Sequence, residues 1–362
     1  MKVVFVIGSL GRGGSERQIV EFVRHAHPRL ANCVVVCLGA AGELAHLVEA
    51  VGARVVPLEI RGLKRNPVSS LMRLGKLLRE FRPDFVYGFL FHGSALGFVT
   101  AALFCRSATR VLGCRSDPAF DGCPRPFRPL RGVVNGLADG LIVNSEAMRK
   151  AWCLDSPRLC SRIHTVPNGV RVPADRIDEA KPDRTCVICV ANLIAYKGHV
   201  TLLDACADIA RQHRNWSLIL VGDGPERGDL EKRVQRTGLD DIVSFVGQRD
   251  DVDVLLAQAQ IAVLASYTEG MPNAVLEAMA HGLPVVATDV GGVRELLGTG
   301  AGLVVPPRDS RSMATALQTM LTDQELRRRA GERGRSLARA NFGIPLMAER
   351  TLDAFRRMAP SQ

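Results

Sequence analysis

Short apolar runs alternate with longer amphipathic stretches along the first half of the chain. The runs are rich in β-branched residues and do not alternate with polar positions, which is typical of parallel strands covered by helices on both faces. We therefore predict strands at 3–7, 33–38, 54–58, 85–91, 110–113 and 140–144. Helices are expected over 43–51 and 71–81, after Ser94, and after Ser15 as the N-cap.

A second series of the same kind begins beyond a polar stretch with charges at alternate places, 174–183. Its apolar runs predict strands at 186–191, 216–221, 242–246, 261–264, 284–287 and 302–305. Its amphipathic stretches predict helices at 200–212, 227–237, 252–258, 273–282, 310–320, 323–340 and 344–358.

Two such series predict an α/β protein with two doubly wound, Rossmann-like domains, as its 362 residues also suggest. The predicted parts are a first domain at 1–170, a linker at 171–183, a second domain at 184–343 and a C-terminal helix at 344–362 that could pack back on the first domain. Ligands of such domains bind outside the carboxyl ends of the strands, so two facing domains predict a binding cleft.

The net charge of +10 lies entirely within residues 1–180, which points to an anionic partner of the first domain. Aromatic residues make up 5% of the chain, and no stacking or recognition-helix pattern supports nucleic acid as that partner. Ten cysteines follow no disulfide or zinc spacing and are interpreted as buried, reduced thiols of a cytoplasmic protein. The uncharged stretch 85–105 is long enough to span a bilayer, but a strand, a turn at His92 and a helix describe it better.

The residues between Ser266 and Gly282 carry the strongest chemical signal. A turn, Gly270-Met271-Pro272, leads into a helix expected to begin near Asn273 and Ala274, where amide groups and the helix dipole favour a phosphate. Glu269 precedes this turn and Glu277 lies one helical turn beyond it. Paired carboxylates beside a phosphate suit a sugar and a ribose, although one dipole-stabilising glutamate and one exposed glutamate would give the same spacing.

Further candidates follow other strands. Lys197 lies in a strand-to-helix loop where it could neutralise a diphosphate, or remain a solvated lysine. The Gly222–Pro225 turn could approach a ligand or could be a tight turn only. Glycines at 8, 11, 13 and 14 do not form a dinucleotide fingerprint but leave a flexible loop for an anion. His92 could be a functional or a structural histidine.

These segments together resemble the retaining GT-B glycosyltransferases of family 4, the group 1 glycosyltransferases. The resemblance rests on the Glu269 to Glu277 spacing (E-x7-E), Lys197-Gly198, Gly222-Asp223-Gly224-Pro225 and the 246–248 turn. Gly13-Gly14-Ser15-Glu16 and the 166–170 segment resemble the family's first glycine loop and its end-of-domain motif. The similarity covers nearly the whole chain and implies a GT-B architecture.

The resemblance also implies a role for each matched residue. His92, Lys197 and Glu269 would be catalytic, with His92 approaching the donor sugar from the first domain. The second domain would hold most of a nucleotide-sugar, with the ribose on Glu277. The implied donor-binding set is Gly13, Gly14, Asn192, Lys197, Gly222, Gly247, Gln248, Glu269, Gly270, Met271, Pro272, Asn273, Ala274 and Glu277.

One position departs from the family pattern, because Asn192 stands where family members often have an arginine. One positive charge on the diphosphate is then missing or supplied by another residue such as Arg249. The resemblance implies transfer with retention by front-face attack, with the departing phosphate taking the acceptor's proton. We expect neither a metal nor another cofactor, because Lys197 and a helix N-terminus would meet the diphosphate charge.

The expected function is transfer of a sugar, with a UDP-sugar as the commonest donor, to a glycan or lipid-linked acceptor in cell-surface polysaccharide or glycolipid synthesis. A nucleotide-sugar epimerase of the same fold and a non-catalytic basic binding protein are the alternatives. Two basic clusters of the first domain could also dock on anionic lipid at the inner leaflet of the plasma membrane. They are Arg61, Lys64, Arg65, Arg73, Lys76, Arg79 and Arg82, and Arg106, Arg110, Arg115, Arg125, Arg128 and Arg131.

Overall fold

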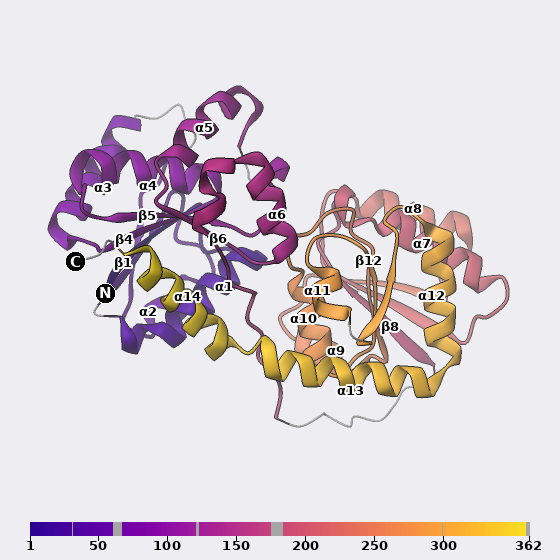
Figure 1. The fold of residues 1–362 in the computed structure, drawn as a ribbon. Helices are drawn as coiled ribbons and strands as arrows, with labels where there is room; N and C mark the ends of the chain where they lie inside the picture. Colours follow the sequence, from indigo (N-terminus) through magenta and orange to yellow (C-terminus); the bar gives the residue numbers. More distant parts are fainter. Residues whose placement is uncertain (31, 61–66, 121–122, 175–183, 299, 360–362) are drawn as a thin grey trace. The chain divides into compact units, whose positions relative to one another are not determined.

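The computed structural model describes residues 1–30, 32–60, 67–120, 123–174, 184–298 and 300–359. The chain divides into two compact units (Figure 1). Unit 1 consists of Met1–Gly169 and Ile344–Gln362, and unit 2 consists of Val170–Gly343. Most of the stretch predicted as a linker, 175–183, lies outside the described residues. Each unit is a parallel β-sheet with helices on its faces, which confirms the predicted fold class of two Rossmann-like domains.

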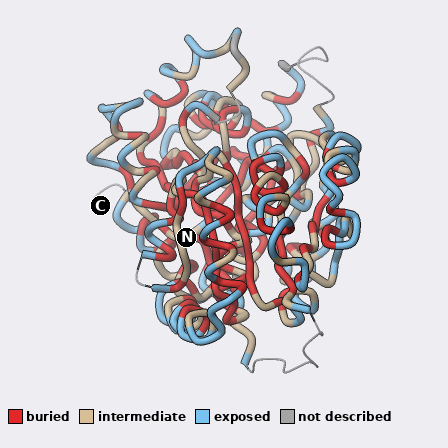
Figure 2. The backbone as a smooth tube through the Cα atoms, turned by 90° about the vertical axis from the view of Figure 1, so that its right-hand side faces the viewer, coloured by how far each residue is buried: buried red, intermediate tan, exposed pale blue. Residues whose placement is uncertain are grey.

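The sheet of unit 1 has seven parallel strands in the order β3-β2-β1-β4-β5-β6-β7. Its central strands are buried along almost their whole length, as their continuous apolar runs predict. Figure 2 shows buried backbone in the interior and exposed backbone toward the outside. The strands are β1 (Lys2–Ile7), β2 (Asn32–Cys37), β3 (Arg54–Pro57), β4 (Phe85–Phe89), β5 (Thr109–Cys114), β6 (Gly140–Val143) and β7 (Ile163–Thr165).

Seven α-helices belong to the described part of unit 1: α1 (Gly14–Ala26), α2 (Ala45–Glu49), α3 (Pro67–Phe81), α4 (Leu90–Phe104), α5 (Arg128–Gly136), α6 (Glu146–Asp155) and α14 (Ile344–Met358). The last of these packs on α1. Its Phe355 is fully buried and lies against Phe85, Tyr87 and Phe22 at ring-centroid distances of 5.0, 5.4 and 6.2 Å. The C-terminal helix therefore completes the core of unit 1.

Several helix starts differ from the predicted ones, and two of these lie beside candidate residues. The N-cap of α1 is Gly13 and not Ser15, which already lies in the first helical turn. The strand predicted to continue to residue 91 ends at Phe89, because Leu90 turns the chain with a φ of +55° and begins α4. Gly93 then packs directly on β1, where a Cβ atom would lie 2.4 Å from the carbonyl oxygen of Val6. His92 is consequently a residue of the first turn of α4.

The sheet of unit 2 has six parallel strands in the order β10-β9-β8-β11-β12-β13. The strands are β8 (Thr185–Val190), β9 (Trp216–Val221), β10 (Val243–Gly247), β11 (Ile261–Leu264), β12 (Val285–Thr288) and β13 (Gly302–Val305). The helices are α7 (His199–Ala210), α8 (Arg227–Thr237), α9 (Val252–Gln258), α10 (Asn273–Ala280), α11 (Val293–Leu297), α12 (Ser310–Thr322) and α13 (Gln324–Asn341). Apolar side chains fill both faces of the sheet.

Each unit has one fully buried tryptophan, Trp152 on α6 and Trp216 on β9. The cysteines correct one expectation, because Cys153 and Cys160 form a disulfide. These two residues are close in sequence, on α6 and the short 3-10 helix that follows it, so a sharp local turn brings them together. The other eight cysteines form no disulfide within the described part of the chain, and Cys105 and Cys123 are only partly buried.

Candidate active site

The loops that follow four neighbouring strands of unit 2 lie at one edge of its sheet. Because β8, β9, β10 and β11 are parallel, their carboxyl ends meet there. Lys197 follows β8, the Gly222–Pro225 turn follows β9, Gly247 ends β10 and Glu269 follows β11. The structure therefore gathers the candidate residues of unit 2 at the edge where α/β domains bind their ligands.

Lys197 and Glu269 are in direct contact at this edge. The Nζ atom of Lys197 donates a hydrogen bond to Oε1 of Glu269 at 2.5 Å. Both side chains are largely buried, with 19% and 11% of their surfaces exposed. The hydroxyl of Ser266 donates to the same Oε1 atom at 2.7 Å. Since an ammonium group has three donors, Lys197 can keep its contact with Glu269 and bind an anion as well.

The two loops that carry this pair are tied together through the backbone. The amide of Tyr267 donates to the carbonyl of Tyr196 at 2.7 Å. Gly198, with a φ of +70°, lies so close to the second loop that a Cβ atom would be 2.0 Å from the carbonyl oxygen of Ala265. Only glycine meets both conditions, so Gly198 sets the distance between the two loops.

The predicted phosphate-binding turn lies at the start of α10, which begins at Asn273 with Pro272 as its N-cap. Asn273, Ala274 and Glu277 are the partly exposed positions of the first five, while the side chains of Val275 and Leu276 are buried in the core. A helix places residues three and four apart on one face. Asn273, Ala274 and Glu277 therefore share one face at the positive end of the helix dipole.

Gly270 and Met271 are buried within a tightly packed loop. The carbonyl of Gly270 accepts a hydrogen bond from the amide of Gly292 at 2.6 Å. Gly291 has a φ of +53°, and a Cβ atom there would lie 2.1 Å from the carbonyl oxygen of Glu269. The loop before α11 thus supports the backbone that precedes α10.

Backbone hydrogen bonds join the loops that follow β8 and β9 on either side of Asn192. Leu193 donates its amide to the carbonyl of Asp223 at 3.0 Å and accepts from the amide of Glu226 at 3.0 Å. Gly222, with a φ of +138°, approaches the backbone of Ala191 in the same way. Asn192 itself is exposed at this junction.

Arg249 and Arg308 each contact a residue other than Asn192. Arg249, the residue proposed to supply the missing charge, forms two hydrogen bonds with Asp251 at 2.6 and 2.8 Å. The guanidinium of Arg308 instead stacks on the ring of Tyr267 at 3.9 Å. Arg308 therefore places a cation against the loop that carries Glu269. The turn that ends with Gln248 follows β10, on the same edge of the sheet.

His199, the first residue of α7, is a buried histidine next to this site. Its side chain is almost fully buried, and neither ring nitrogen has a hydrogen-bond partner among the residues that the structure describes. Burial, and secondarily the positive charge of Lys197, lowers the pKa of His199 to about 4. The ring is therefore neutral at physiological pH and adds no second charge beside Lys197.

The candidate residues of unit 1 lie near the carboxyl edge of its own sheet. His92 is exposed in the first turn of α4, with its ring edge-on to Phe91 at 5.6 Å. Gly13 and Gly14 begin α1, and the side chain of Glu16 folds back over Gly13. Burial raises the pKa of the Glu16 carboxyl. These residues are placed within unit 1, and Lys197 and Glu269 are the predicted catalytic pair that the structure brings into contact.

Three residues that position Glu269 or its loop were not predicted from the sequence. Ser266 orients Glu269, and Thr288, at the end of β12, donates to the carbonyl of Ser266 at 2.6 Å. Gly291 supports the backbone of Glu269 as described. Ser266 could have been found from its position, since it directly follows the strand region and precedes Glu269 by three residues.

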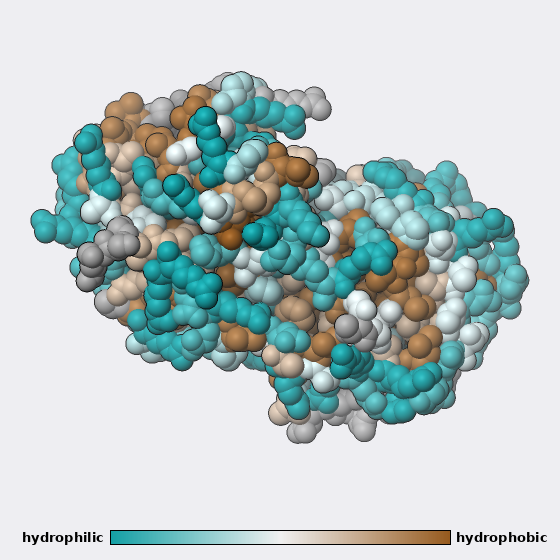
Figure 3. All heavy atoms as spheres, viewed as in Figure 1, coloured by the Kyte–Doolittle hydropathy of each residue, from teal (hydrophilic) through white to brown (hydrophobic). Residues whose placement is uncertain are grey.

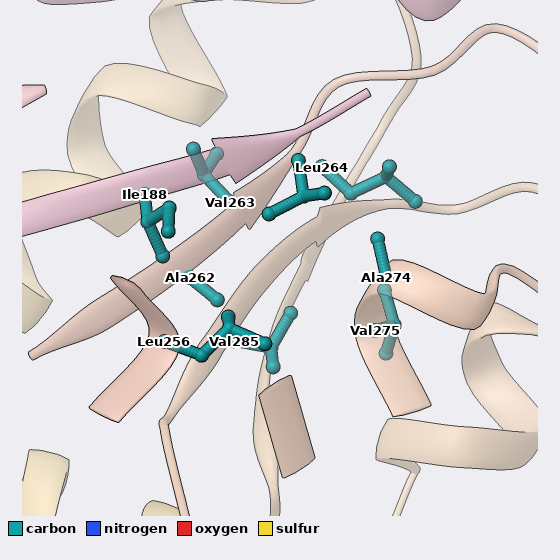
Figure 4. Close-up of a pocket in the computed structure, with 9 residues that line it drawn as sticks. Ile188, Leu256, Ala262, Val263, Leu264, Ala274, Val275 and Val285 are labelled. Carbon is teal, nitrogen blue, oxygen red and sulfur yellow. The ribbon is translucent and has the colours of Figure 1, made fainter. Parts of the chain in front are cut away.

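A small cavity lies inside unit 2, between its sheet and α9 and α10 (Figure 4). Apolar side chains, among them Ile188, Val263 and Val275, form its wall. Its volume of about 10 Å³ corresponds to about one water molecule. It is a packing gap and has no room for a nucleotide. Within the described ranges, no three histidine, cysteine or acidic side chains converge as a metal site would require.

Comparisons with known families divide the chain at nearly the same place as the fold. Residues 12–172 match the Glycosyltransferase Family 4 model, and residues 173–337 match the model of Glycosyl transferases group 1. Each half of the chain is thus similar to a glycosyltransferase family. The first match falls within unit 1 except at its last residues, and the second match falls within unit 2.

The chain is also similar to two glycosyltransferases over part of their length. The chain is 33% identical over 179 residues to the alpha-D-kanosaminyltransferase of Streptomyces kanamyceticus, covering 49% of this chain and 46% of that protein. It is 32% identical over 196 residues to the lipopolysaccharide core biosynthesis glycosyltransferase LpsE of Rhizobium meliloti, covering 54% and 55%. The matched part thus spans about half the length of these relatives.

A solved structure matches the whole chain. It is the structure of Anabaena Alr3699/HepE in complex with UDP-glucose, with a TM-score of 0.84 at 22% identity. The similarity covers 99% of this chain and 100% of HepE. At this identity it shows a common fold, which is the GT-B fold.

Proposed function

We propose that this protein is a retaining glycosyltransferase that moves a sugar from a nucleotide-sugar donor to a glycan or lipid-linked acceptor, in cell-surface polysaccharide or glycolipid synthesis. The observation that carries the proposal is the contact of Lys197 with Glu269 in front of α10. It places a cation, a carboxylate and a helix N-terminus at the carboxyl edge of one sheet. A sugar diphosphate offers the matching groups, a dianionic bridge and vicinal hydroxyls.

The donor is proposed to be a UDP-sugar. HepE, which has the same fold, binds UDP-glucose, and the relatives carry the names of sugar transferases. In this chain the diphosphate would lie on Lys197 and the start of α10. Glu277 would accept hydrogen bonds from the ribose hydroxyls, and Glu269 would accept them from the donor sugar.

The proposed reaction breaks the bond between the anomeric carbon and the diphosphate oxygen, and forms a bond from that carbon to the acceptor oxygen on the same face. The acceptor's proton passes to the departing phosphate oxygen, so the protein needs no separate base. Its residues position the reactants and stabilise the negative charge that develops on the diphosphate. Lys197 would supply this stabilisation, and we propose that no divalent cation is required.

A donor screen tests the binding step. Thermal unfolding is measured with UDP-, GDP- and ADP-sugars, with the free sugars as controls, and a UDP-sugar is expected to raise the midpoint. Removal of divalent cations with a chelator should leave the shift unchanged. If no nucleotide-sugar raises the midpoint, the proposal of a donor site is wrong.

Two variants test the assignment of the site. Lys197→Ala and Glu269→Ala should each lower the turnover number by about 100- to 1000-fold, as expected when charge stabilisation or substrate positioning is removed. Arg211→Ala, a substitution of the exposed C-cap arginine of α7, is the matched control and should retain full activity. Unchanged transfer by both site variants would refute the assignment.

The alternative of a nucleotide-sugar epimerase requires no acceptor. Release of UDP is therefore measured with and without glycan and lipid-linked acceptors, and the anomeric configuration of the product is read by NMR. Release that rises with the acceptor, with a retained configuration, supports the transferase. Equal release without an acceptor, accompanied by free sugar, supports the epimerase. No release with any donor supports a non-catalytic binding protein.

A further inference from the structure

Three adjacent helices of unit 1 present apolar side chains to solvent. Each carries a pair one helical turn apart, with exposed fractions between 39% and 63%. The helix α4 packs against both α3 and α5, so the three pairs lie on neighbouring helices. We call this surface the α3–α5 face, and Figure 3 shows hydrophobic side chains among hydrophilic ones in this region. The pairs are Val68 and Met72 on α3, Val99 and Leu103 on α4, and Leu130 and Val133 on α5.

The composition of α4 sets this face apart from an ordinary protein surface. Its fifteen residues, LFHGSALGFVTAALF, contain no aspartate, glutamate, lysine or arginine. A helix that is apolar on all sides is normally enclosed by protein or lipid. Here Leu103 is 58% exposed, so protein does not enclose it. Seven of the fifteen residues of α4 are buried within unit 1, so only one side of the helix is open to solvent. No helix among those described is long and apolar enough to cross a bilayer.

Basic side chains accompany the apolar pairs. The three helices carry five lysines and arginines and one acidic residue, Glu80. Lys76 and Arg128 are exposed, and Arg106 is exposed just beyond the end of α4. Lys76 lies 3.9 Å from Glu80, but this pair is open to solvent on both sides and holds its charge only weakly. The guanidinium of Arg79 stacks on the ring of Phe104 at 4.6 Å, so a charge lies directly beside the apolar surface of α4.

The structure also removes several residues from the predicted basic surface. Arg61, Lys64 and Arg65 lie outside the described residues, as does the side chain of Arg125. Arg110 and Arg131 form ion pairs with Asp139 and Asp155. Arg115 is partly buried and bonds Asn168 within unit 1. The charges that remain exposed are those around the α3–α5 face, Arg73, Lys76, Arg79, Arg82, Arg106 and Arg128.

We propose that the α3–α5 face is a docking surface for an anionic lipid bilayer. The apolar side chains suit the acyl boundary of such a membrane, and the surrounding lysines and arginines suit its anionic headgroups. The excess of positive charge selects lipid over a second copy of the same basic face, since two such faces repel each other. This inference goes beyond the proposed function and does not depend on it. It places the protein on the membrane whatever sugar it transfers.

Flotation of the full chain with vesicles tests the docking surface. Vesicles of phosphatidylcholine alone are compared with vesicles that also contain phosphatidylglycerol, at low and high salt. We expect binding to the anionic vesicles only, and weaker binding at high salt because salt screens the surface charges. A Lys76→Gln, Arg106→Gln, Arg128→Gln triple variant should bind about 100-fold more weakly, since each charge contributes about fivefold.

Substitutions of apolar residues distinguish binding through the α3–α5 face from a general attraction of basic residues to anionic vesicles. Leu103→Glu with Val133→Glu should abolish flotation, whereas Val254→Glu, at an exposed valine of α9 in unit 2, should not. A matched charge control removes the exposed residues Arg211, at the C-cap of α7, and Lys232 and Arg236, on α8, and should bind as the wild type does. Thermal unfolding verifies that every variant is folded.

The proposal is wrong if anionic vesicles do not float the protein, or if the controls in unit 2 lose binding as strongly as the variants of the α3–α5 face. Sedimentation equilibrium measures whether the protein associates with a second copy of itself. A wild-type dimer that Leu103→Glu dissociates would show that the face binds a second copy and not a membrane.

Discussion

Ser266 shows, at the scale of single residues, how the candidate site depends on side chains that would not touch a ligand. Its hydroxyl holds Oε1 of Glu269, its carbonyl accepts from Thr288, and it is itself fully buried. The pair of Lys197 and Glu269 joins residues 72 positions apart. Spacing along the chain predicts that both follow strands, but a contact at this distance depends on the order of the strands in the sheet.

Replacing Ser266 should impair transfer without unfolding the protein. In Ser266→Ala, Glu269 loses one of its two partners, and its carboxylate can rotate away from the position in which it would hold a sugar. We expect the turnover number to fall about 10- to 100-fold while KM changes little, because misplacement by about 1 Å has effects of this size. Ser266→Thr retains the hydroxyl and should recover most of the activity. Ser244→Ala, at an exposed serine of β10, is the control. Equal kinetics of Ser266→Ala and this control would contradict the positioning role.

His199 makes stability depend on pH in a defined direction. Its pKa in the folded state is about 4, below the ordinary value of 6.5, so between these values the unfolded chain binds a proton that the folded chain does not. Unfolding free energy should therefore fall as pH is lowered from about 6.5, by up to about 1.4 kcal/mol per pH unit. The variant His199→Gln should lack this part of the dependence.

Urea unfolding followed by circular dichroism at pH 5 and pH 7.5 measures the difference. Burial and the charge of Arg357 also lower the pKa of His164, which contributes in the same direction but is present in both proteins. The comparison of wild type with His199→Gln therefore isolates one histidine. An identical loss of stability in both proteins would show that His199 does not titrate as described.

At the scale of elements, the hydrophobic pattern predicted most of the fold. The bounds of α8, α9 and α14, and of the strands β9, β11 and β13, agree with the expected ranges. The helices α5, α6 and α11 were missed, because α5 and α6 bury two residues each and α11 has five residues, too few for a clear period. The start of α4 was misplaced because leucine rarely adopts a positive φ such as that of Leu90.

Two glycines of unit 2 allow the energetic cost of a left-handed backbone conformation to be measured apart from the cost of a steric clash. Gly198 and Gly238 have φ values of +70° and +63°, but a Cβ atom at Gly238 would meet nothing within 4 Å. Gly238→Ala should cost about 1 to 2 kcal/mol of unfolding free energy, the penalty of a left-handed conformation. Gly198→Ala should cost more, and should also lower donor affinity, because the loop that carries Lys197 must move away from Ala265. Chemical unfolding and donor titration measure the two effects, and equal behaviour of the variants would contradict the argument.

At the scale of the whole molecule, the chain returns to its first unit at the end. Unit 1 combines the first 169 residues with α14, whose Phe355 fills the space among Phe22, Phe85 and Tyr87. Removing this ring should therefore act on unit 1 while it leaves the fold of unit 2 intact. The amphipathic pattern of 344–358 predicts the helix, but its aromatic partners come from two distant segments, α1 and β4, that the pattern does not connect.

Phe355→Ala should lower the unfolding free energy of unit 1 by about 3 to 5 kcal/mol, the usual effect of removing a buried phenylalanine. Hydrogen exchange read by mass spectrometry should show faster exchange in β1 and β4 and unchanged exchange in β8 and β9. Leu317→Ala, which removes a fully buried side chain of α12, should give the opposite distribution. Uniform acceleration in both units after either substitution would show that the two units unfold together.

The two tryptophans provide a spectroscopic consequence of this division. The chain has two in all, and Trp152 and Trp216 are each fully buried in a different unit. Trp152→Phe leaves a protein whose indole emission reports on unit 2 alone, and Trp216→Phe leaves one that reports on unit 1. A nucleotide-sugar at 100 times its dissociation constant should stabilise the unit that binds it by about 2.7 kcal/mol. The shift of the indole emission during unfolding, measured in each variant with and without the donor, would then show which unit binds the donor.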